Sequence, residues 1–177
     1  MDHLTCAITG HRPEKFYFKE DSSDCKELKE EMKLTFESLY NSGYDQFIVG
    51  GARGVDMWAS EILLDLRKRF GHLELYCLLP FKSYTAKWSK DDIERQRHIL
   101  LQANGCKILA ERYSRDCYKR RNYEMVDRSQ LLLAICDRNN PNSGSMQTVQ
   151  YARKKHMETI FIDPQTFEFS MVRNAYY

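Results

Sequence analysis

Several classes of protein are excluded by what this sequence does not contain. No apolar run approaches the ~20 residues that a membrane-spanning helix needs, so we expect no membrane partner. The first four residues (MDHL) lack the basic and apolar segments of a signal peptide, which predicts a cytoplasmic protein. The six cysteines include no CxxC and no closely spaced Cys/His set, so we expect reduced thiols and no metal site. Three of them, Cys6, Cys77 and Cys136, lie in apolar runs and are expected in the core.

An excess of charge of one sign is also missing. The 177 residues carry 27 Lys and Arg against 25 Asp and Glu, a formal net charge of +2. That balance argues against a protein whose entire surface neutralises nucleic-acid phosphates, while it leaves room for a local basic site. A hydrophobic content of 42% and an aromatic content of 12% fit a chain with a buried core. The length suits one domain over residues 1–177.

Short apolar runs, bounded by Gly, Pro, Asn or Asp, alternate with longer helical patterns and predict strands. The predicted strands are Leu4–Thr9, Gln46–Val49, Glu74–Leu79, Lys107–Ala110, Leu131–Cys136 and Thr159–Ile162. The run at 131–136 is apolar without alternation. Continuous apolarity indicates burial on both faces, as in a parallel sheet that is covered by helices.

Helical patterns separate these strands. The first keeps one apolar face between Leu28 and Tyr40, and Asp24 with Glu27 predicts a capping box at its start. The others cover 55–70, 89–104, 117–129 and 145–156. The alternation predicts an α/β fold: a single doubly wound, mostly parallel, Rossmann-like sheet with helices on both faces. In such sheets ligands bind beyond the carboxyl ends of the strands.

The strongest functional signal is the segment Gly50-Gly51-Ala52-Arg53-Gly54-Val55-Asp56, which follows the second predicted strand. Glycines between a buried strand and a helix N-terminus expose backbone N–H groups, and the helix dipole adds a positive potential. We therefore predict phosphate binding by this turn, through Gly50, Gly51, Ala52, Arg53 and Gly54. The segment is neither a Walker A loop nor a GxGxxG fingerprint. Asp56, at the helix start, belongs to the same predicted ligand site, where a capping role suits it better than catalysis.

Two further strand ends carry small or cationic residues. The first strand leads into Gly10-His11-Arg12, where Gly10 permits close approach of a ligand and Arg12 suits a phosphate or carboxylate. After the fifth strand come Asp137, a polar loop and Ser143-Gly144-Ser145 at the next helix start. That helix start suits a phosphate or ribose hydroxyls. We expect the two glycine-containing helix starts to lie on neighbouring strand ends and to anchor one nucleotide-like ligand.

Basic and aromatic residues are interleaved between Arg112 and Tyr123, the only dense basic segment of the chain. Such a segment fits either a nucleic-acid surface or a solvated helix face. Because its helix leads into the fifth strand, Arg121 and Asn122 belong near the carboxyl edge of the sheet. We therefore assign both to a ligand pocket.

The loop after the third strand, from Leu79 to Trp88, interleaves aromatic residues with lysines. We expect Phe81 to pack on the core. Tyr84 and Trp88 fit two interpretations, packing on the core or stacking on a nucleotide base.

At these residues the chain resembles the YpsA-like family of the SLOG superfamily, which also includes the DNA-processing protein DprA and the LOG-type phosphoribohydrolases. The matching segments, in chain order, are Ile8–Pro13, Gly50–Ala59, Pro80-Phe81 with Trp88, Asn122 ahead of Asp127-Arg128-Ser129, and Ser143–Ser145. The resemblance implies a Rossmann-like bacterial protein that binds a nucleotide or an ADP-ribose-like ligand, as a sensor in stress or cell division. Superfamily relatives often self-associate, so a homo-oligomer is also expected.

Two other functions stay open. LOG-type enzymes use the glutamate of a Pro-Gly-Gly-x-Gly-Thr-x-x-Glu motif to hydrolyse an N-glycosidic bond, and the resemblance puts Thr148 about where that acid would stand. Asp56, Asp127 and Asp137 are alternative carboxylates, and the sequence singles out no catalytic residue. The second alternative is a DprA-like single-stranded DNA-binding protein that uses residues 112–121. Beyond a nucleotide-derived ligand, we expect no cofactor.

Overall fold

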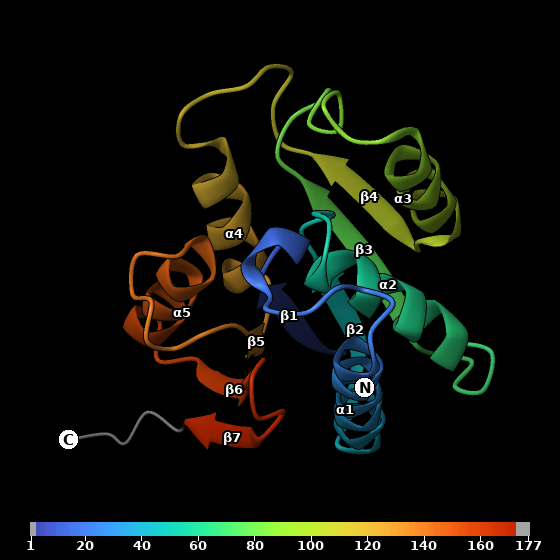
Figure 1. Ribbon diagram of the computed structural model, residues 1–177, viewed down its shortest axis with the longest axis vertical. Helices are drawn as coiled ribbons and strands as arrows, with labels where there is room; N and C mark the ends of the chain where they lie inside the picture. Colours follow the sequence, from blue (N-terminus) through green and yellow to red (C-terminus); the bar gives the residue numbers. More distant parts are fainter. Residues whose placement is uncertain (1–2, 173–177) are drawn as a thin grey trace.

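The chain is organised around a seven-stranded sheet with the strand order β4-β3-β2-β1-β5-β6-β7. The computed structural model describes residues 3–172, and Figure 1 labels its elements. The strands are β1 Leu4–Gly10, β2 Tyr44–Val49, β3 Glu74–Leu79, β4 Gly105–Ile108, β5 Leu131–Ile135, β6 Glu158–Ile162 and β7 Phe169–Val172. The helices are α1 Ser23–Asn41, α2 Val55–Leu66, α3 Lys90–Gln102, α4 Cys117–Asp127 and α5 Gly144–Lys154, with a short 3-10 helix, η1, at Pro13–Lys15.

The strand pairing confirms the doubly wound, mostly parallel sheet. From the central strand β1, successive strands β2, β3 and β4 extend the sheet in one direction. The chain then returns to the other side of β1, where β5 pairs in parallel with Ile8 opposite Leu133. β6 continues in parallel, whereas β7 pairs antiparallel with β6 at the edge.

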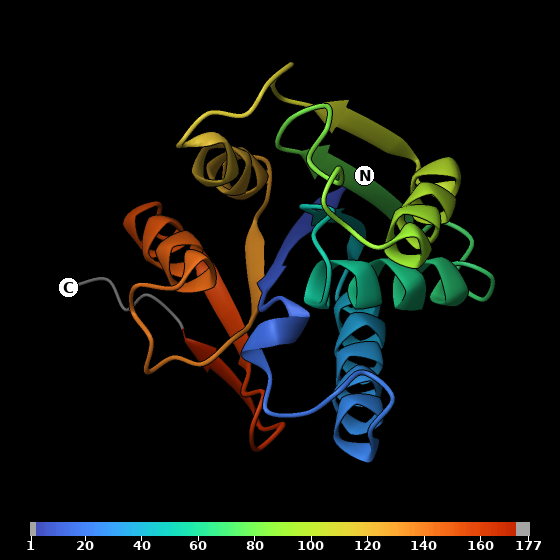
Figure 2. The ribbon, with the colours of Figure 1, turned by 45° about the horizontal axis from the view of Figure 1, so that its top comes forward.

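Helices cover both faces of the sheet, as predicted. Helices α1, α2 and α3 lie on one face, and α4 and α5 lie on the other (Figure 2). The core is divided accordingly, because alternate residues of a strand point to opposite faces. Leu131 and Leu133 belong to the cluster beneath α1 and α2, while Leu132 belongs to the cluster beneath α4 and α5. This two-sided burial explains the continuous apolar run of β5.

Serine side chains begin three of the helices. The Ser89 hydroxyl accepts a hydrogen bond from the N–H of Asp92 at 3.1 Å, which confirms the predicted start of α3. The N-cap of helix α1 lies two residues before Asp24, the start of the expected Asp24–Glu27 box. This cap is Ser22, whose hydroxyl accepts from the N–H of Cys25 at 3.2 Å, so the predicted capping box is wrong.

Two edge strands differ from the prediction. β4 lies two residues before the predicted 107–110, because Asn104 fixes where pairing with β3 begins. Its backbone N–H donates to Leu75 O at 2.8 Å, and its side-chain oxygen accepts from Leu75 N–H at 3.0 Å. β7 was not predicted. Its residues are exposed or half-buried, so the segment lacks the apolar run that identifies a buried strand.

The three cysteines expected in the core, Cys6, Cys77 and Cys136, are buried. Cys25 and Cys117 are buried as well, Cys106 is exposed, and all six thiols are free. Within residues 3–172, no helix combines the length and the apolarity that crossing a bilayer would require.

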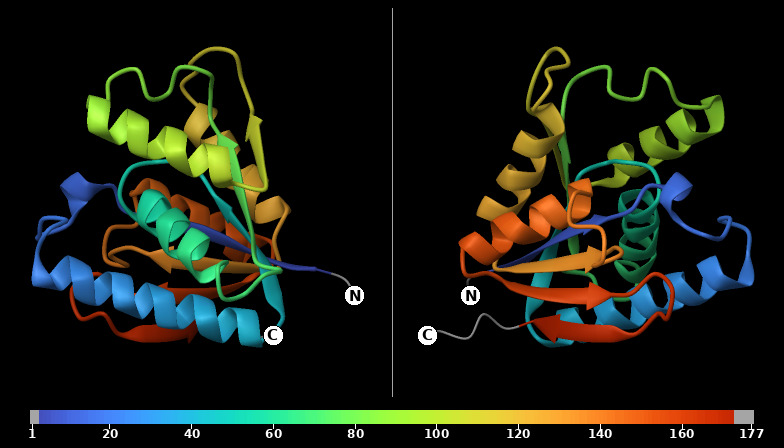
Figure 3. Two further views of the ribbon diagram at one scale, coloured as in Figure 1. Left: turned by 90° about the vertical axis from the view of Figure 1, so that its right-hand side faces the viewer. Right: turned by 60° about the vertical axis from the view of Figure 1, so that its left-hand side comes forward.

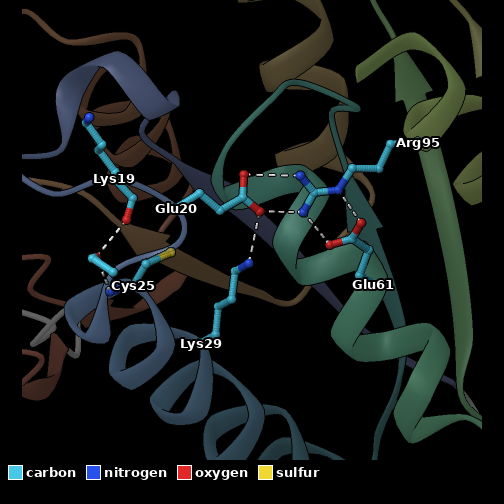
Figure 4. Close-up of polar contacts among 7 residues, drawn as sticks. Lys19, Glu20, Cys25, Lys29, Glu61 and Arg95 are labelled. Carbon is cyan, nitrogen blue, oxygen red and sulfur yellow. Dashed lines mark hydrogen bonds and ion pairs between the residues drawn. The ribbon is translucent and has the colours of Figure 1, made fainter. Parts of the chain in front are cut away.

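An ion-pair network joins the loop before α1 with α1, α2 and α3 on one face of the sheet (Figure 4). Arg95 of α3 donates to Glu20, which precedes α1, at 2.5 and 3.1 Å. The same guanidinium donates to both carboxylate oxygens of Glu61 on α2. Lys29 of α1 also donates to Glu20, at 3.0 Å. The loop between η1 and α1 is thereby fixed to the helical layer.

Candidate functional site

A cleft lies where the winding of the sheet changes direction. From β1 the chain leaves toward η1 and α1 on one face, and from β5 it leaves toward α5 on the other (Figure 3). Diverging loops at such a switch point leave a crevice at the carboxyl edge of a doubly wound sheet. Here the crevice is a cleft of about 550 Å³.

Ten of the predicted site residues line this cleft. They are Gly10, His11, Arg12, Ala52, Asp56, Arg121, Asn122, Ser143, Gly144 and Ser145. Gly50 and Arg53 instead line a small adjoining cavity together with Tyr84 and Trp88. Asp137 lines a third hollow, which it shares with His11 and Ser143.

The two glycine-containing helix starts do not lie on neighbouring strands, so that expectation is wrong. The order of the sheet places β1 between β2 and β5. Gly10-His11-Arg12, at the end of β1, therefore separates the start of α2 from the start of α5. The Gly10 position is tight, since a Cβ there would lie 2.5 Å from the Val55 side chain of α2. This close packing of α2 against β1 forms one wall of the cleft.

Arg121 lies at the floor of the cleft and is only 6% exposed. Its guanidinium donates to the carbonyl of Gly50 and to Asn122 Oδ1, the latter at 2.7 Å. Its Nη1 lies 3.9 Å from Asp56 Oδ2. Burial lowers the pKa of Arg121 and the nearby Asp56 opposes that shift, but a guanidinium stays charged in proteins. The placement of α4 at this edge agrees with the position predicted for Arg121 and Asn122.

Asp56 fixes the glycine-rich turn. Its Oδ2 accepts from the N–H of Ala52 at 3.1 Å, while Gly54 occupies the N-cap position of α2. The expected cap at the helix start is therefore wrong. Burial raises the pKa of Asp56, and the positive charge of Arg121 opposes that shift.

The glycines of this turn are required by their neighbours. A Cβ at Gly50 would overlap the Arg121 guanidinium, and one at Gly51 would lie 2.5 Å from Leu79. Gly51 and Gly54 also have positive φ angles, 69° and 80°. One N–H of the turn, that of Ala52, is already occupied by Asp56. Packing thus accounts for glycine at each of these positions, independently of any ligand.

Arg53 points toward α3 and η1. It forms ion pairs with Glu14 of η1 and, at 3.7 Å, with Asp92 of α3. Its guanidinium also lies 5.9 Å from the Trp88 ring. These partners place Arg53 at the side of the cleft, where it holds η1 in position.

His11 is 7% exposed and lies between the cleft and the hollow that contains Asp137. Its Nε2 accepts from the backbone N–H of Asp137 at 2.9 Å, so this nitrogen carries no proton. Burial lowers the pKa of His11; the negative charge of Asp137 opposes the shift and Lys15 reinforces it. The neutral ring links the end of β1 to the end of β5.

The start of α5 is open to the cleft. The Ser143 hydroxyl accepts from Met146 N–H at 3.2 Å and caps the helix. A Cβ at Gly144 would meet no atom within 4 Å, so this backbone borders free space. Thr148 is 1% exposed, and its hydroxyl donates to Gly144 O at 2.9 Å. Thr148 therefore has no access to the cleft in which a LOG-type acid would act.

Four cleft residues, on η1 and in the β5–α5 loop, were not predicted from the sequence: Glu14, Lys15, Asn140 and Asn142. Pro13, which begins η1, was a signal that the chain turns back over the strand end. The cations Arg12 and Lys15 line the cleft and form no ion pair among the described residues. The carboxylates that line the cleft are Glu14 and Asp56, and each of them lies near an arginine. Residues 3–172 contain no cluster of three or more His, Cys, Asp or Glu side chains that would hold a metal ion.

Phe81 is buried, as expected, and Tyr84 and Trp88 pack partly against the main core. The rings of Tyr84 and Trp88 meet edge to face at 5.4 Å. Both also line the small cavity beside Arg53. Packing on the core is thus confirmed for both rings, and stacking on a nucleotide base stays a prediction.

Comparison with known proteins agrees with this architecture. The model of the YspA SLOG family (YpsA) matches residues 6–167. The chain belongs to this SLOG family. It is also similar to UPF0398 proteins of Bacillus thuringiensis strain Al Hakam and of Bacillus cereus strains AH187 and B4264. Each is 28% identical over 152 residues, which cover 84% of this chain and 82% of the relative.

Proposed function

We propose that this SLOG protein binds a nucleotide or a nucleotide-derived ligand of the ADP-ribose type in the cleft between β1 and β5, as a cytoplasmic sensor. One observation carries the proposal: Arg12 and Lys15, which pair with no acid within residues 3–172, line the same cleft as the open, Ser143-capped start of α5. Cations and a helix N-terminus both attract phosphate. Asn140 and Asn142 add amide groups that suit ribose hydroxyls.

The proposal is for binding without hydrolysis by a LOG-type glutamate. The buried Thr148 supports this, and so does Asp127, whose carboxylate accepts from Tyr151 and pairs with Lys155 outside the cleft. Glu14 pairs with Arg53, and Asp56 is held by Ala52 and Arg121. Each of these carboxylates already has a structural partner.

Isothermal titration calorimetry with ADP-ribose, NAD and AMP tests the proposal. We expect Arg12→Ala to weaken binding about ten-fold to a hundred-fold, because it removes one charge-assisted hydrogen bond. Gly144→Val should also weaken binding, since its side chain enters free space at the helix start. The matched control is Arg97→Ala, an exposed arginine of α3 that pairs with Glu94.

Two results would contradict the proposal. One is the absence of heat with all three nucleotides. The other is binding that is the same in Arg12→Ala, Gly144→Val and wild type. Incubation of the bound nucleotides, followed by chromatography, separates binding from turnover, and release of a free base or ribose phosphate would show hydrolysis.

A further inference from the structure

Two loops that are distant in the sequence meet beside the cleft. One is the β3–α3 loop, residues 80–89, and the other runs from the end of β4 through the first turn of α4, residues 109–120. The Lys82 N–H donates to Ala110 O at 3.1 Å. The Phe81 ring packs edge to face with the rings of Tyr113 and Tyr118, with centroids 5.7 and 6.0 Å apart. Both panels of Figure 3 show the loops side by side at the top. We call these two segments the basic rim.

The basic rim concentrates positive charge. It contains six of the 27 Lys and Arg and two of the 25 Asp and Glu, a net charge of +4. The remaining 21 basic and 23 acidic residues give the rest of the chain −2. The rim cations are Lys82, Lys87, Arg112, Arg115, Lys119 and Arg120, and the acids are Glu111 and Asp116. The overall charge of +2 therefore conceals a strongly polarised surface.

Most of these cations are available to a partner. All six are exposed, and only Lys82 forms an ion pair among the described residues, with Glu111 at 3.0 Å. Tyr113 lies among them and is 65% exposed, with its ring edge against Phe81. An exposed ring surrounded by unpaired cations fits a partner that has both repeated negative charges and flat apolar groups.

We propose that the basic rim binds single-stranded nucleic acid. Unpaired Lys and Arg side chains contact the phosphates, and Tyr113 stacks on an unpaired base. Tyr118 belongs to the rim and also lines the cleft, with the Arg12 guanidinium 5.2 Å from its ring. A strand on the rim can thus place its terminal nucleotide in the cleft, and this last step rests on the function proposed above.

Fluorescence anisotropy of a labelled oligothymidylate, titrated with the full chain at several salt concentrations, tests the rim. With about five phosphate contacts, affinity should fall on the order of a hundred-fold between about 50 and about 200 mM salt. Arg112→Glu combined with Arg115→Glu should weaken binding at least about ten-fold and reduce the log–log salt slope by about 1.4. Tyr113→Ala should weaken binding about ten-fold and leave the slope unchanged.

The matched control is Arg153→Glu combined with Lys154→Glu, which changes the net charge equally at exposed positions of α5. This pair should leave affinity and slope unchanged. The proposal is overturned if oligothymidylate does not bind, or if the control pair weakens binding as much as the rim pair. It is also overturned if phosphatidylserine vesicles bind with the same dependence on Arg112 and Arg115 while Tyr113→Ala has no effect on oligothymidylate.

Calorimetry separates this proposal from the proposed function. The Arg112→Glu and Arg115→Glu variant should bind AMP or ADP-ribose as tightly as wild type, because neither residue lines the cleft. Oligothymidylate binding without any binding of mononucleotides would leave the rim proposal standing and overturn the cleft function. Mononucleotide binding without oligothymidylate binding would leave the cleft function standing and overturn the rim proposal.

Discussion

The glycines after β2 are explained by close packing around one buried guanidinium. Gly50 leaves room for Arg121 and supplies the carbonyl that Arg121 binds. Gly54 lets the start of α2 approach the backbone of His11, whose carbonyl accepts from Val55 N–H at 3.2 Å. A glycine-rich turn before a helix is commonly associated with phosphate binding. Here the same residues are needed to assemble the cleft floor, whether or not a phosphate binds to the turn.

A pair of glycine substitutions tests this view. We expect Gly51→Ala to lower the free energy of unfolding by about 1–3 kcal/mol, because its φ is positive and its Cβ would overlap Leu79. Gly144→Ala should instead preserve or raise stability by up to about 1 kcal/mol, since its Cβ meets no neighbour. Urea denaturation followed by circular dichroism measures both. Equal midpoints for the two variants would contradict the packing argument.

His11 makes stability depend on pH. Burial places its folded-state pKa below the ordinary value of 6.5, so the unfolded chain binds the proton more readily. The stabilising effect of the neutral ring is thus complete above about 6.5 and is lost as the pH falls below it, by at most about 1.4 kcal/mol per pH unit. We expect the free energy of unfolding to decrease more between about pH 7.5 and 5.5 in wild type than in His11→Gln. Parallel pH profiles would rule out this role.

At the level of elements, the position of η1 depends on side chains from outside it. Arg53 pairs with Glu14 of η1, and Arg95 of α3 holds Glu20 in the loop that follows. Between these anchors, Phe16 packs against Trp58 of α2 with ring centroids 5.2 Å apart. One wall of the cleft is therefore connected to α2 and α3.

Acid titration tests the second anchor. Burial raises the pKa of Glu20, but hydrogen bonds from Arg95 and Lys29 outweigh it and lower the pKa to about 2. A lowered carboxylate pKa stabilises the fold above the unfolded-state value, and this stabilisation is lost as the pH falls from about 4.5 to about 2. We expect Glu20→Gln to reduce the free energy of unfolding at pH 7 by on the order of 1 kcal/mol, after allowance for solvent screening. The free energy of unfolding of this variant should also fall less steeply between about pH 4.5 and about pH 2. Glu30→Gln, at an exposed 3.6 Å pair with Lys33 on α1, is the control and should change neither stability nor its acid dependence.

At the scale of the whole molecule, the sequence was most informative where both faces of an element are buried. Alternating apolar runs and helices indicated the doubly wound sheet, and the unbroken run of β5 indicated two-sided burial. The positions of edge strands were less predictable, because β4 begins where Asn104 happens to contact Leu75 and β7 has few buried side chains. Strand order decides which loops meet at the edge of the sheet. The position of β1 between β2 and β5 depends on pairing between residues that are far apart in the sequence, so it was not predictable from local patterns.

The candidate site was predictable to a similar extent. The loops at strand ends converged as expected, since parallel strands place their carboxyl ends at one edge. The partners of long side chains were not predictable. Arg53 meets carboxylates from η1 and α3, Glu14 and Asp92, which are distant in sequence. The binding roles of all the predicted site residues stay predictions until the calorimetry is done.

The buried central strands and the exposed edge strand of the sheet should also differ in local stability. We expect backbone amides of β1 and β5 to exchange with deuterium on the order of a hundred-fold or more slower than those of β7, whose side chains are largely exposed. Hydrogen exchange with mass spectrometry measures the difference. Equal protection of β7 and β1 would show that the edge strand unfolds only together with the whole sheet.

The chain contains two tryptophans, and they occupy different surroundings. Trp58 is buried in the main core, whereas Trp88 lies beside the Arg53 guanidinium and lines the cavity next to the cleft. The intrinsic emission of the protein therefore combines one indole that reports on the integrity of the core with one that reports on the cavity. Replacing Trp88 by Phe leaves Trp58 as the only indole for unfolding studies with excitation selective for tryptophan, and the difference from wild type isolates the emission of the indole beside Arg53.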